Sequence, residues 1–559
     1  MKYVWCVAVL AVSAHAQQLR SLKTVPVPTP AGLENYVRDQ QALVALGKAL
    51  FWDMQTGSDG VTACATCHFH AGADHRAQNQ IADPQQPFPP NLMLDMVYFP
   101  FRWLSNPEDR GSVVLRDLSM RVGSMGLYRR KFLGIQSGHA AELGEELQDR
   151  PEFTLDGLHV RRVTQRNSPS VINAVFFVSQ FWDGRANRVF NGFTPTGSAA
   201  DAPGVWYATE AGLERRPVRL DPASLASQAV GPIMDHLEMS YEGRTWPHLA
   251  RKLYSLRPLA LQQVAQDDSV LGPMADGSGR GLREDVTYLA LVQQAFLPAL
   301  WESPLPTDGE FSQAEANFSL FWGLALHAYQ STLVSGDSPF DRFQEGDTSA
   351  LTAQEQEGMR LFQTTARCTT CHGGAEFTAA SFTAGAGRNN RAFTRTGVRP
   401  VGEDPGIANG NFKSSGLRNV ELTGPYFHNG GQATLEQVIE FYERGGDFGT
   451  NNGAIRAFRV TPAQKASLVA FLKSLTDERV RHDRAPFDHP ELCVPIGHDA
   501  VPSGVASYPN SARERWAAVP AVGAQGHPLP LGTFEDLISG TAGAPRAHSM
   551  QDRCSAPLP

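Results

Sequence analysis

The chain has 559 residues, of which 42% are hydrophobic and 19% are charged, and its formal net charge is −8. This composition is typical of a folded globular protein and excludes a disordered chain, and the length predicts roughly two to four domains. The acidic charge balance gives no basis for binding nucleic acid or an anionic membrane surface.

Residues 1–16 have the pattern of an export signal. Lys2 precedes an apolar stretch at 3–12, and Ala14 and Ala16 have the spacing of a signal cleavage site. A buried N-terminal strand is the alternative interpretation. No later apolar run reaches the roughly 18–20 residues needed to span a bilayer, so we expect no stable membrane anchor. The sequence therefore predicts a periplasmic or secreted protein.

Two copies of a Cys-x-x-Cys-His motif carry most of the functional information. They are Cys64-Ala65-Thr66-Cys67-His68 and Cys368-Thr369-Thr370-Cys371-His372. The motif is typical of c-type haem attachment, in which two thiols add to the haem vinyl groups and the histidine becomes the proximal iron ligand. A zinc ribbon would need a second cysteine pair near each motif, and a redox dithiol would not need the adjacent histidine. We therefore predict two covalently bound haem c groups.

A helix is predicted before each motif. The first covers about 33–51 and the second about 353–363, where Thr352 and Glu355 have the pattern of a capping box. Both helices contain Gly-x-x-Leu-Phe at the same register, which indicates an internal repeat and hence two related haem domains. A helix at about 462–475, with proline at its first position, is expected to close the second domain.

The predicted fold is mainly α, with two cytochrome c-like haem domains, long loop insertions and an irregular C-terminal tail. Its parts are a signal peptide at 1–16, an N-terminal haem domain with insertions at 17–335, a C-terminal haem domain at 336–480 and a Pro/Gly-rich extension at 481–559. In an oxidising compartment, Cys493 and Cys554 in this extension could form a disulfide. Insertions at about 69–158, 187–227 and 255–312 are expected to build access walls or partner surfaces.

Several further blocks stand in order along the chain: RNSPSVINAVF at 166–176, QFWDGRA at 180–186, GPI at 231–233 with EM at 238–239, STLV at 331–334, SPFD at 338–341, LRNV at 417–420 and TGPYFH at 423–428. Together with the two haem motifs, these blocks resemble the bacterial di-haem cytochrome c peroxidases and their MauG-type relatives. The resemblance covers both haem domains, and it is more specific for the family than for one activity within it.

The resemblance implies that the haem with proximal ligand His68 reacts with peroxide. In the family's pattern, Glu238 carries a proton from the near to the far peroxide oxygen, Gln228 binds the oxygen by a hydrogen bond, and Pro232 keeps one face of the iron open. Trp182 falls where the family places a tryptophan between the two haems, to carry an electron or a hole. A solvated Glu238 and a core aromatic at Trp182 are the structural alternatives.

The same resemblance implies an interdomain calcium site. Asn167, with the backbone carbonyls of Thr423 and Pro425, matches its ligands, and oxygen ligands of this kind suit Ca²⁺. The alternative is that Asn167 caps a turn before Pro169.

Two positions distinguish branches of the family. His159 matches the removable distal histidine of the peroxidases, although the loop before it is unusually long and an exposed histidine is the alternative. Tyr442 stands where electron-accepting peroxidases carry a methionine ligand of the second haem and where MauG-type enzymes carry tyrosine. It could instead be a core aromatic. His428 is a candidate haem neighbour, with a weaker case as an axial ligand than Tyr442.

These assignments predict an oxidoreductase that reduces H2O2 at the N-terminal haem, while the C-terminal haem, bound by His372 and Tyr442, relays or stores the second oxidising equivalent. A small redox protein, either a c-type cytochrome or a cupredoxin, is the expected electron donor. MauG-like oxidation of a protein substrate, a di-haem oxygenase acting on an organic substrate, and a pure electron-transfer cytochrome are the alternatives.

Overall fold

The computed structural model describes residues 18–83, 88–307, 309–384, 391–407, 409–449, 455–540 and Cys554. The expected signal peptide at 1–16 lies outside these residues. None of the helices in the described ranges combines the length and the apolar character needed to span a bilayer.

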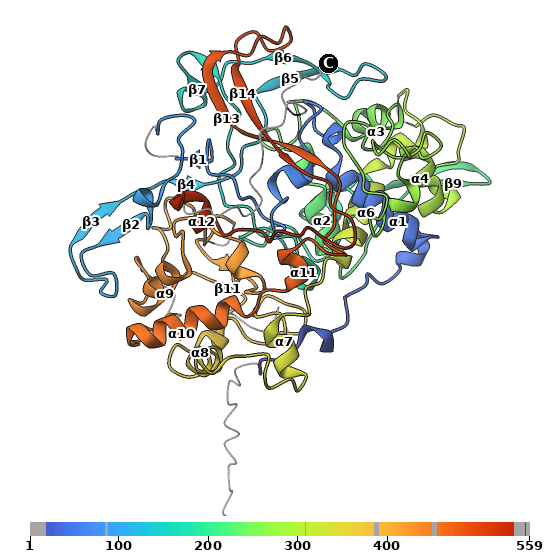
Figure 1. Ribbon diagram of the computed structural model, residues 1–559. Helices are drawn as coiled ribbons and strands as arrows, with labels where there is room; N and C mark the ends of the chain where they lie inside the picture. The colour runs from blue at the N-terminus through green and yellow to red at the C-terminus, as the bar shows by residue number, and fades with distance from the viewer. Residues whose placement is uncertain are drawn as a thin grey trace, which may run out of the picture.

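Helices build two cores, and small two-stranded sheets lie around them (Figure 1). The helices are α1 (Gln40–Trp52), α2 (Ser224–Ala229), α3 (Trp246–Tyr254), α4 (Tyr288–Ala295), α5 (Gln313–Ala316), α6 (Phe318–Thr332), α7 (Pro339–Gln344), α8 (Ala353–Gln363), α9 (Leu435–Glu443), α10 (Pro462–Lys473), α11 (Glu478–Arg481) and α12 (Phe534–Ser539). The strands are β1 (Ile81–Ala82), β2 (Arg102–Leu104), β3 (Val114–Asp117), β4 (Arg121–Val122), β5 (Arg130–Gly134), β6 (Leu143–Glu146), β7 (Thr154–Leu155), β8 (Leu158–His159), β9 (Val205–Thr209), β10 (Gly212–Arg216), β11 (Phe393–Thr394), β12 (Phe412–Lys413), β13 (Leu492–Pro502) and β14 (Ala512–Val519).

The first core is built on the helix that precedes the first haem motif. This helix, α1, begins at Gln40 rather than near residue 33, because Asp39 caps it by accepting hydrogen bonds from two backbone N–H groups; residues 33–35 form a separate 3-10 turn. The α1 helix packs against α6, and Gly47 lies at the crossing. A Cβ on Gly47 would stand 1.9 Å from the carbonyl oxygen of Ala325, so only glycine allows this approach.

The second core repeats this geometry. The α8 and α10 helices have the predicted first residues; α8 starts with the expected capping box, and α10 starts with the expected proline and also has a capping box at Thr461 and Gln464. They pack against each other at Gly358, where a Cβ would stand 1.9 Å from the carbonyl oxygen of Ser467. The glycine of each Gly-x-x-Leu-Phe repeat therefore allows a close helix crossing in its own core. In the first core α1 crosses α6, and in the second core α8 crosses α10 in the same way.

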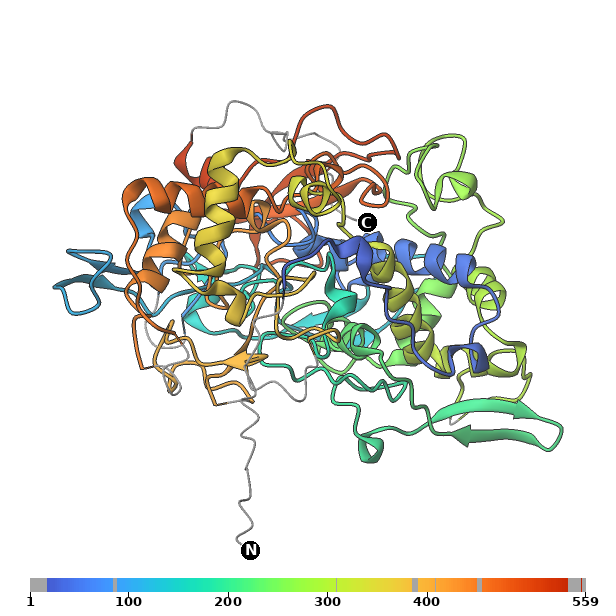
Figure 2. The same ribbon diagram turned by 90° about the horizontal axis from the view of Figure 1, so that it is seen from below.

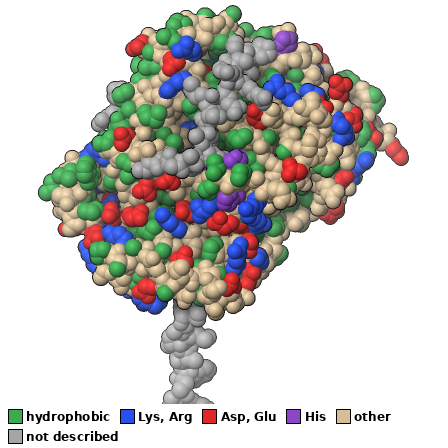
Figure 3. Space-filling view, viewed as in Figure 1, with side chains coloured by type: hydrophobic (Ala, Val, Ile, Leu, Met, Phe, Trp, Pro, Cys, Tyr) green, Lys and Arg blue, Asp and Glu red, His purple; other side chains and the backbone are tan. Residues whose placement is uncertain are grey.

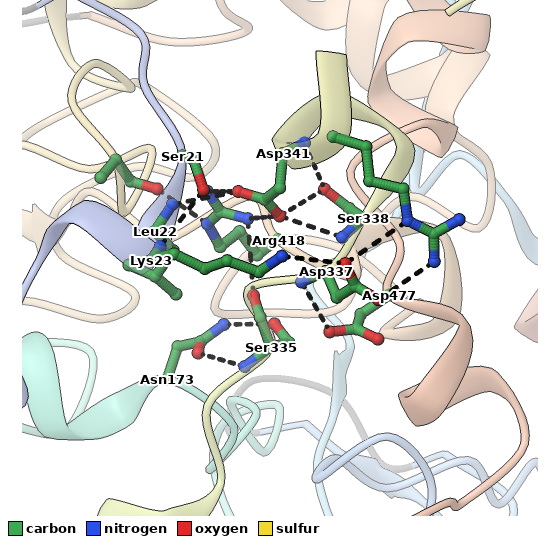
Figure 4. Close-up of polar contacts among 12 residues, drawn as sticks. Ser21, Leu22, Lys23, Asn173, Ser335, Asp337, Ser338, Asp341, Arg418 and Asp477 are labelled. Carbon is green, nitrogen blue, oxygen red and sulfur yellow. Dashed lines mark hydrogen bonds and ion pairs between the residues drawn. The ribbon is translucent and has the colours of Figure 1, made fainter. Parts of the chain in front are cut away.

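Buried polar contacts hold the connection between the two cores together (Figure 4). Arg418 forms a bidentate pair with Asp341 at 2.7 and 2.9 Å, and the backbone N–H of Leu22 donates to the same carboxylate at 3.0 Å. The amide of Asn173 donates to Ser335 at 2.6 Å and accepts from its backbone N–H at 2.9 Å. The predicted boundary between residues 335 and 336 falls in this connection, and several of the family-like blocks converge on it.

Two of the three insertions form hairpins rather than plain loops, and the third, at 255–312, contains α4. The β2–β3 and β5–β6 hairpins arise from 69–158, and the β9–β10 hairpin from 187–227 extends away from the body in Figure 2. Exposed hydrophobic side chains gather over the β2–β3 hairpin (Figure 3), and they include Trp103, Val113 and Leu115.

The expectation of an irregular C-terminal tail is wrong for 492–519. This part forms the long β13–β14 hairpin, whose Leu492, Val494 and Val519 side chains are buried in the first core. Since that contact is made with residues distant in the sequence, the local composition gave no sign of it. Cys493 forms a disulfide with Cys554, with their Cα atoms 5.6 Å apart.

Candidate functional site

The first Cys-x-x-Cys-His motif forms a 3-10 turn (Cys64–Cys67) close to the end of α1. Neither cysteine of this turn is in a disulfide. His68 follows, and its Nδ1 lies 2.8 Å from the carbonyl oxygen of Gly72. A proton held on Nδ1 by this contact leaves Nε2 unprotonated, which is the form that binds a metal. The turn thus presents two thiols and a metal-binding nitrogen together.

The second motif is built in the same way. Its 3-10 turn (Cys368–Thr370) follows α8, and the Nδ1 of His372 lies 2.9 Å from the carbonyl oxygen of Ser415. Burial lowers the pKa of His372 and of His68, so both imidazoles are kept in the neutral, ligating form. Two separate parts of the chain therefore present one arrangement of donors.

A cavity of about 1520 Å³ surrounds the second motif, and this exceeds the volume of most small-molecule sites. Cys368, Cys371 and His372 line it together with apolar side chains of α9 and α10. Tyr442 of α9 also lines it, and burial followed by the nearby thiols of Cys371 and Cys368 raises the pKa of the Tyr442 phenol well above its usual value. The cavity thus has the size, lining and donors that a porphyrin needs.

Glu238 lies beside the first motif. Its carboxyl contributes, after burial, to the raised pKa of both cysteine thiols, and the sulfur of the adjacent Met239 is 4.0 Å from that of Cys64. Burial and then the charge of Asp235 raise the pKa of Glu238 to about 7, while Arg185 opposes the rise. A carboxyl with this pKa can both take up and release a proton near neutral pH.

Gln228 and Pro232 lie on the segment that leads to Glu238. Gln228 belongs to α2, and its carbonyl accepts from Gly231 at 3.0 Å just before Pro232 starts a 3-10 turn (Pro232–Met234). The ring of Phe181 lies against Gly231. The structure therefore places the three family positions on one continuous segment, with Glu238 at the end next to the cysteines.

A buried ion cluster that the sequence did not reveal holds this segment in place. The guanidinium of Arg244 donates to the carbonyls of Ile233 and Met239, which lie on either side of Glu238, and pairs with Glu142 at 2.9 Å. Lys252 pairs with the same carboxylate at 2.7 Å, and all three charged side chains are fully buried. Glu142 comes from the insertion at 69–158, so this insertion contributes to the support of the Glu238 segment.

Trp182 stands on the wall of the second cavity. Its Nε1 donates to the carbonyl of Asn167 at 2.7 Å, and its ring meets that of His428 edge-on at 6.3 Å between centroids. His428 also stacks on Phe412 and lines the cavity. The neighbouring Phe181 lies against Gly231, so of two successive aromatic residues one contacts the segment that leads to Glu238 and the other lines the second cavity.

The proposed calcium ligands are brought together on the same wall. Asn167, Thr423 and Pro425 all line the cavity, and the Asn167 amide donates to the carbonyl of Pro425. A flip of this amide would present an oxygen beside the Pro425 carbonyl instead. The donor set of neutral oxygens is one that Ca²⁺ accepts.

His159 is not brought to the first site by any contact in the described ranges. It ends β8, and its backbone N–H donates to the carbonyl of Asn510 at 2.8 Å, so the segment is tied to the C-terminal extension. Its Nδ1 is buried without a hydrogen-bond partner among the described residues. The assignment of His159 as a distal ligand stays a prediction.

Two Cys-x-x-Cys-His turns, each with a histidine whose Nδ1 contacts a backbone carbonyl, define a protein of the di-haem c-type cytochrome class. The profile of the family described as di-haem cytochrome c peroxidase matches residues 41–103 and 135–349. The chain belongs to this family. The match includes the first motif and ends before the second.

The relatives include both peroxidases and a MauG protein. The chain is 28% identical to cytochrome c551 peroxidase of Pseudomonas aeruginosa over 56% of this chain and 66% of the relative. It is 34% identical to cytochrome-c peroxidase IdrP1 of Denitromonas iodatirespirans over 30% of this chain and 54% of the relative, and 34% identical to methylamine utilization protein MauG of Methylorubrum extorquens over 28% and 43%. The chain thus matches about half the length of such curated relatives. A solved MauG-like protein associated with microbial copper homeostasis is 20% identical, with a TM-score of 0.44 over 83% of this chain and 97% of that one.

Proposed function

We propose that the protein is a di-haem peroxidase that reduces H2O2 at the first motif and receives electrons through the second. The observation that carries this proposal is Glu238, a half-buried carboxyl beside the cysteines of the first motif, whose pKa is raised to about 7. An electron-transfer cytochrome has no use for such a group, whereas peroxide reduction needs a proton carrier. Membership of a peroxidase family agrees with this interpretation.

Haem attached to Cys64 and Cys67 and ligated by His68 would supply the redox-active iron for the reduction. The overall reaction consumes one H2O2, two electrons and two protons and yields two water molecules. In this reaction Glu238, as the carboxylate, takes the proton from the near peroxide oxygen and returns it to the far oxygen as the O–O bond breaks. The Gln228 amide would hydrogen-bond the bound oxygen. Pro232 has no side-chain atom that binds a metal, so it would leave the peroxide-binding position unblocked.

The second site would hold haem on Cys368, Cys371 and His372, and the Tyr442 phenol, which lines the same cavity, would be a further ligand. Trp182 would pass electrons between the two sites, since its indole is fixed by the Asn167 carbonyl on the cavity wall. Calcium held by Asn167 and the carbonyls of Thr423 and Pro425 would fix the same wall. The electron donor in this proposal is a c-type cytochrome or a cupredoxin outside the cytoplasm.

Tyr442 supports a second candidate function, MauG-like oxidation of a protein substrate or oxygenation of an organic one. A phenolate ligand favours higher oxidation states of iron, whereas methionine favours Fe(II). A site with tyrosine is therefore suited to storing an oxidising equivalent until a substrate provides the electrons.

Peroxide turnover with a reduced cytochrome c donor tests the first function. We expect two donor molecules oxidised for each H2O2 consumed. Incorporation of labelled oxygen from peroxide into an organic product, with no donor oxidised, would instead support an oxygenase.

A further inference from the structure

A lysine is buried in the wall of the cavity around the second motif. Lys413 of β12 is 7% exposed, and its Nζ lies 3.9 Å from the centroid of the Phe177 ring and 3.5 Å from the Gln180 side-chain oxygen. Both neighbours come from the N-terminal half of the chain, and all three residues line the cavity with His372. The ammonium group therefore stands at the boundary of the two halves, inside the candidate haem site.

No acidic side chain in the described ranges lies within ion-pair distance of this ammonium group. The carboxylate whose charge acts on Lys413 is that of Asp183, and it is already paired with Arg166 at 2.9 Å and with Arg185 at 3.1 Å. Burial consequently lowers the pKa of Lys413 to about 7. An unpaired buried ammonium costs several kcal/mol, so this position calls for an anion supplied from the cavity itself.

Haem carries two propionate carboxylates on one edge of the porphyrin. The buried Arg418, which also lines the cavity, is not free for them because Asp341 occupies its guanidinium. We propose that Lys413 pairs with a propionate of the haem attached at Cys368 and Cys371, and thereby directs the carboxylate edge of that haem toward Trp182. The backbone supports this direction, since the Lys413 N–H donates to the Trp182 carbonyl at 2.7 Å. This inference rests on one part of the proposed function, which is that haem is bound at the second motif.

A cation beside the propionate favours the reduced haem, which carries one positive charge fewer than the oxidised haem. In Lys413→Met, we expect the ratio of reduced to oxidised second haem at a given potential to fall roughly tenfold. For a one-electron couple this corresponds to a midpoint potential that is lower by about 59 mV. Lys413→Arg keeps the charge and should stay close to the parent protein. Lys473→Met removes an exposed lysine of the same half and is the matched control.

The holoprotein is titrated by visible spectroelectrochemistry, which resolves two reduction steps, and the step that Tyr442→Met displaces belongs to the second haem. The propionate bending band in the resonance Raman spectrum reports on the propionate itself, so a general loss of packing would not shift it. We expect this band to shift in Lys413→Met but not in Lys473→Met. If Lys413→Met loads haem poorly, Lys413→Gln, which can still contact Gln180, is used in its place.

An unchanged potential and an unchanged propionate band in a variant that carries both haems would overturn the pairing. A parent protein with no haem at the second motif would instead refute the proposed function, so the two failures are distinguishable.

Discussion

Replacement of Glu238 by glutamine removes the titrating group but keeps its size and one hydrogen-bonding oxygen. Since a positioned acid–base group contributes about 10²–10⁴-fold, we expect kcat/KM for H2O2 to fall by that factor, which corresponds to about 3–5 kcal/mol of barrier. The assay is the initial rate of oxidation of a reduced cytochrome c donor at limiting peroxide. Haem content and the optical spectrum of the variant should match those of the parent protein.

The pH profile gives a sharper test of the same residue. Burial raises the pKa of Glu238 to about 7, and proton abstraction needs the carboxylate. As the pH falls below 7, the ionised fraction falls to roughly one tenth at pH 6 and one hundredth at pH 5, and kcat/KM should fall in the same proportion. Glu238→Gln should lose this acidic limb.

Two charged neighbours of Glu238 supply matched controls, because their effects on its pKa are opposite. Asp235 raises the pKa of Glu238 and Arg185 lowers it, so Asp235→Asn should move the acidic limb to lower pH and Arg185→Gln should move it to higher pH. Full peroxide turnover with an unchanged acidic limb in Glu238→Gln would refute the assignment. So would a limb that moves in the same direction in both control variants.

Further predictions concern the second haem and the two buried structures that support the sites. Tyr442→Met should raise the midpoint potential of the second haem, because methionine favours Fe(II); a lower potential would exclude the phenol as its ligand. Glu142→Gln should lower the free energy of unfolding by about 3–5 kcal/mol, because it leaves buried cations unpaired, whereas the exposed Glu145→Gln should change it by less than about 0.5 kcal/mol. Arg244 and Lys252 hold the pKa of Glu142 at about 2 in spite of its burial, so this stabilisation should be complete above about pH 4.5 and be lost as the pH falls toward 2; equal acid sensitivity of parent and variant would contradict it. Gly358→Ala should cost about 1–3 kcal/mol in chemical denaturation, because its Cβ would overlap a carbonyl, and Gly402→Ala, with open space around it, should be nearly neutral.

The parts of the fold that the sequence predicted are those with local signals. The start of α8 follows from Thr352 and Glu355, and that of α10 from Thr461 and Gln464, because each capping box is complete within four residues. The start of α1 was misplaced because apolar residues at 33–37 continued the pattern. The available signal was Asp39, whose carboxylate caps the helix.

The contacts between distant segments could not be predicted in this way. Glu142 and Arg244 are 102 residues apart, and in the sequence each is expected to be a charged residue exposed to solvent. In the fold they form a buried pair that supports the segment carrying Glu238. Lys413 lies in a block between two recognisable motifs, and only the cavity shows that its ammonium group is enclosed. The haem motifs were identified because their chemistry depends on residues adjacent in sequence, whereas the surrounding support depends on the fold.

The central claim is that each Cys-x-x-Cys-His turn binds one haem covalently, and the haem count per chain tests it most directly. The protein is produced in a host with a c-type haem ligation system, and its intact mass and pyridine haemochrome absorbance are measured under denaturing conditions. We predict two haems per chain in the parent protein and one in each of the double variants Cys64→Ala/Cys67→Ala and Cys368→Ala/Cys371→Ala. A parent protein that carries one haem or none would contradict the account.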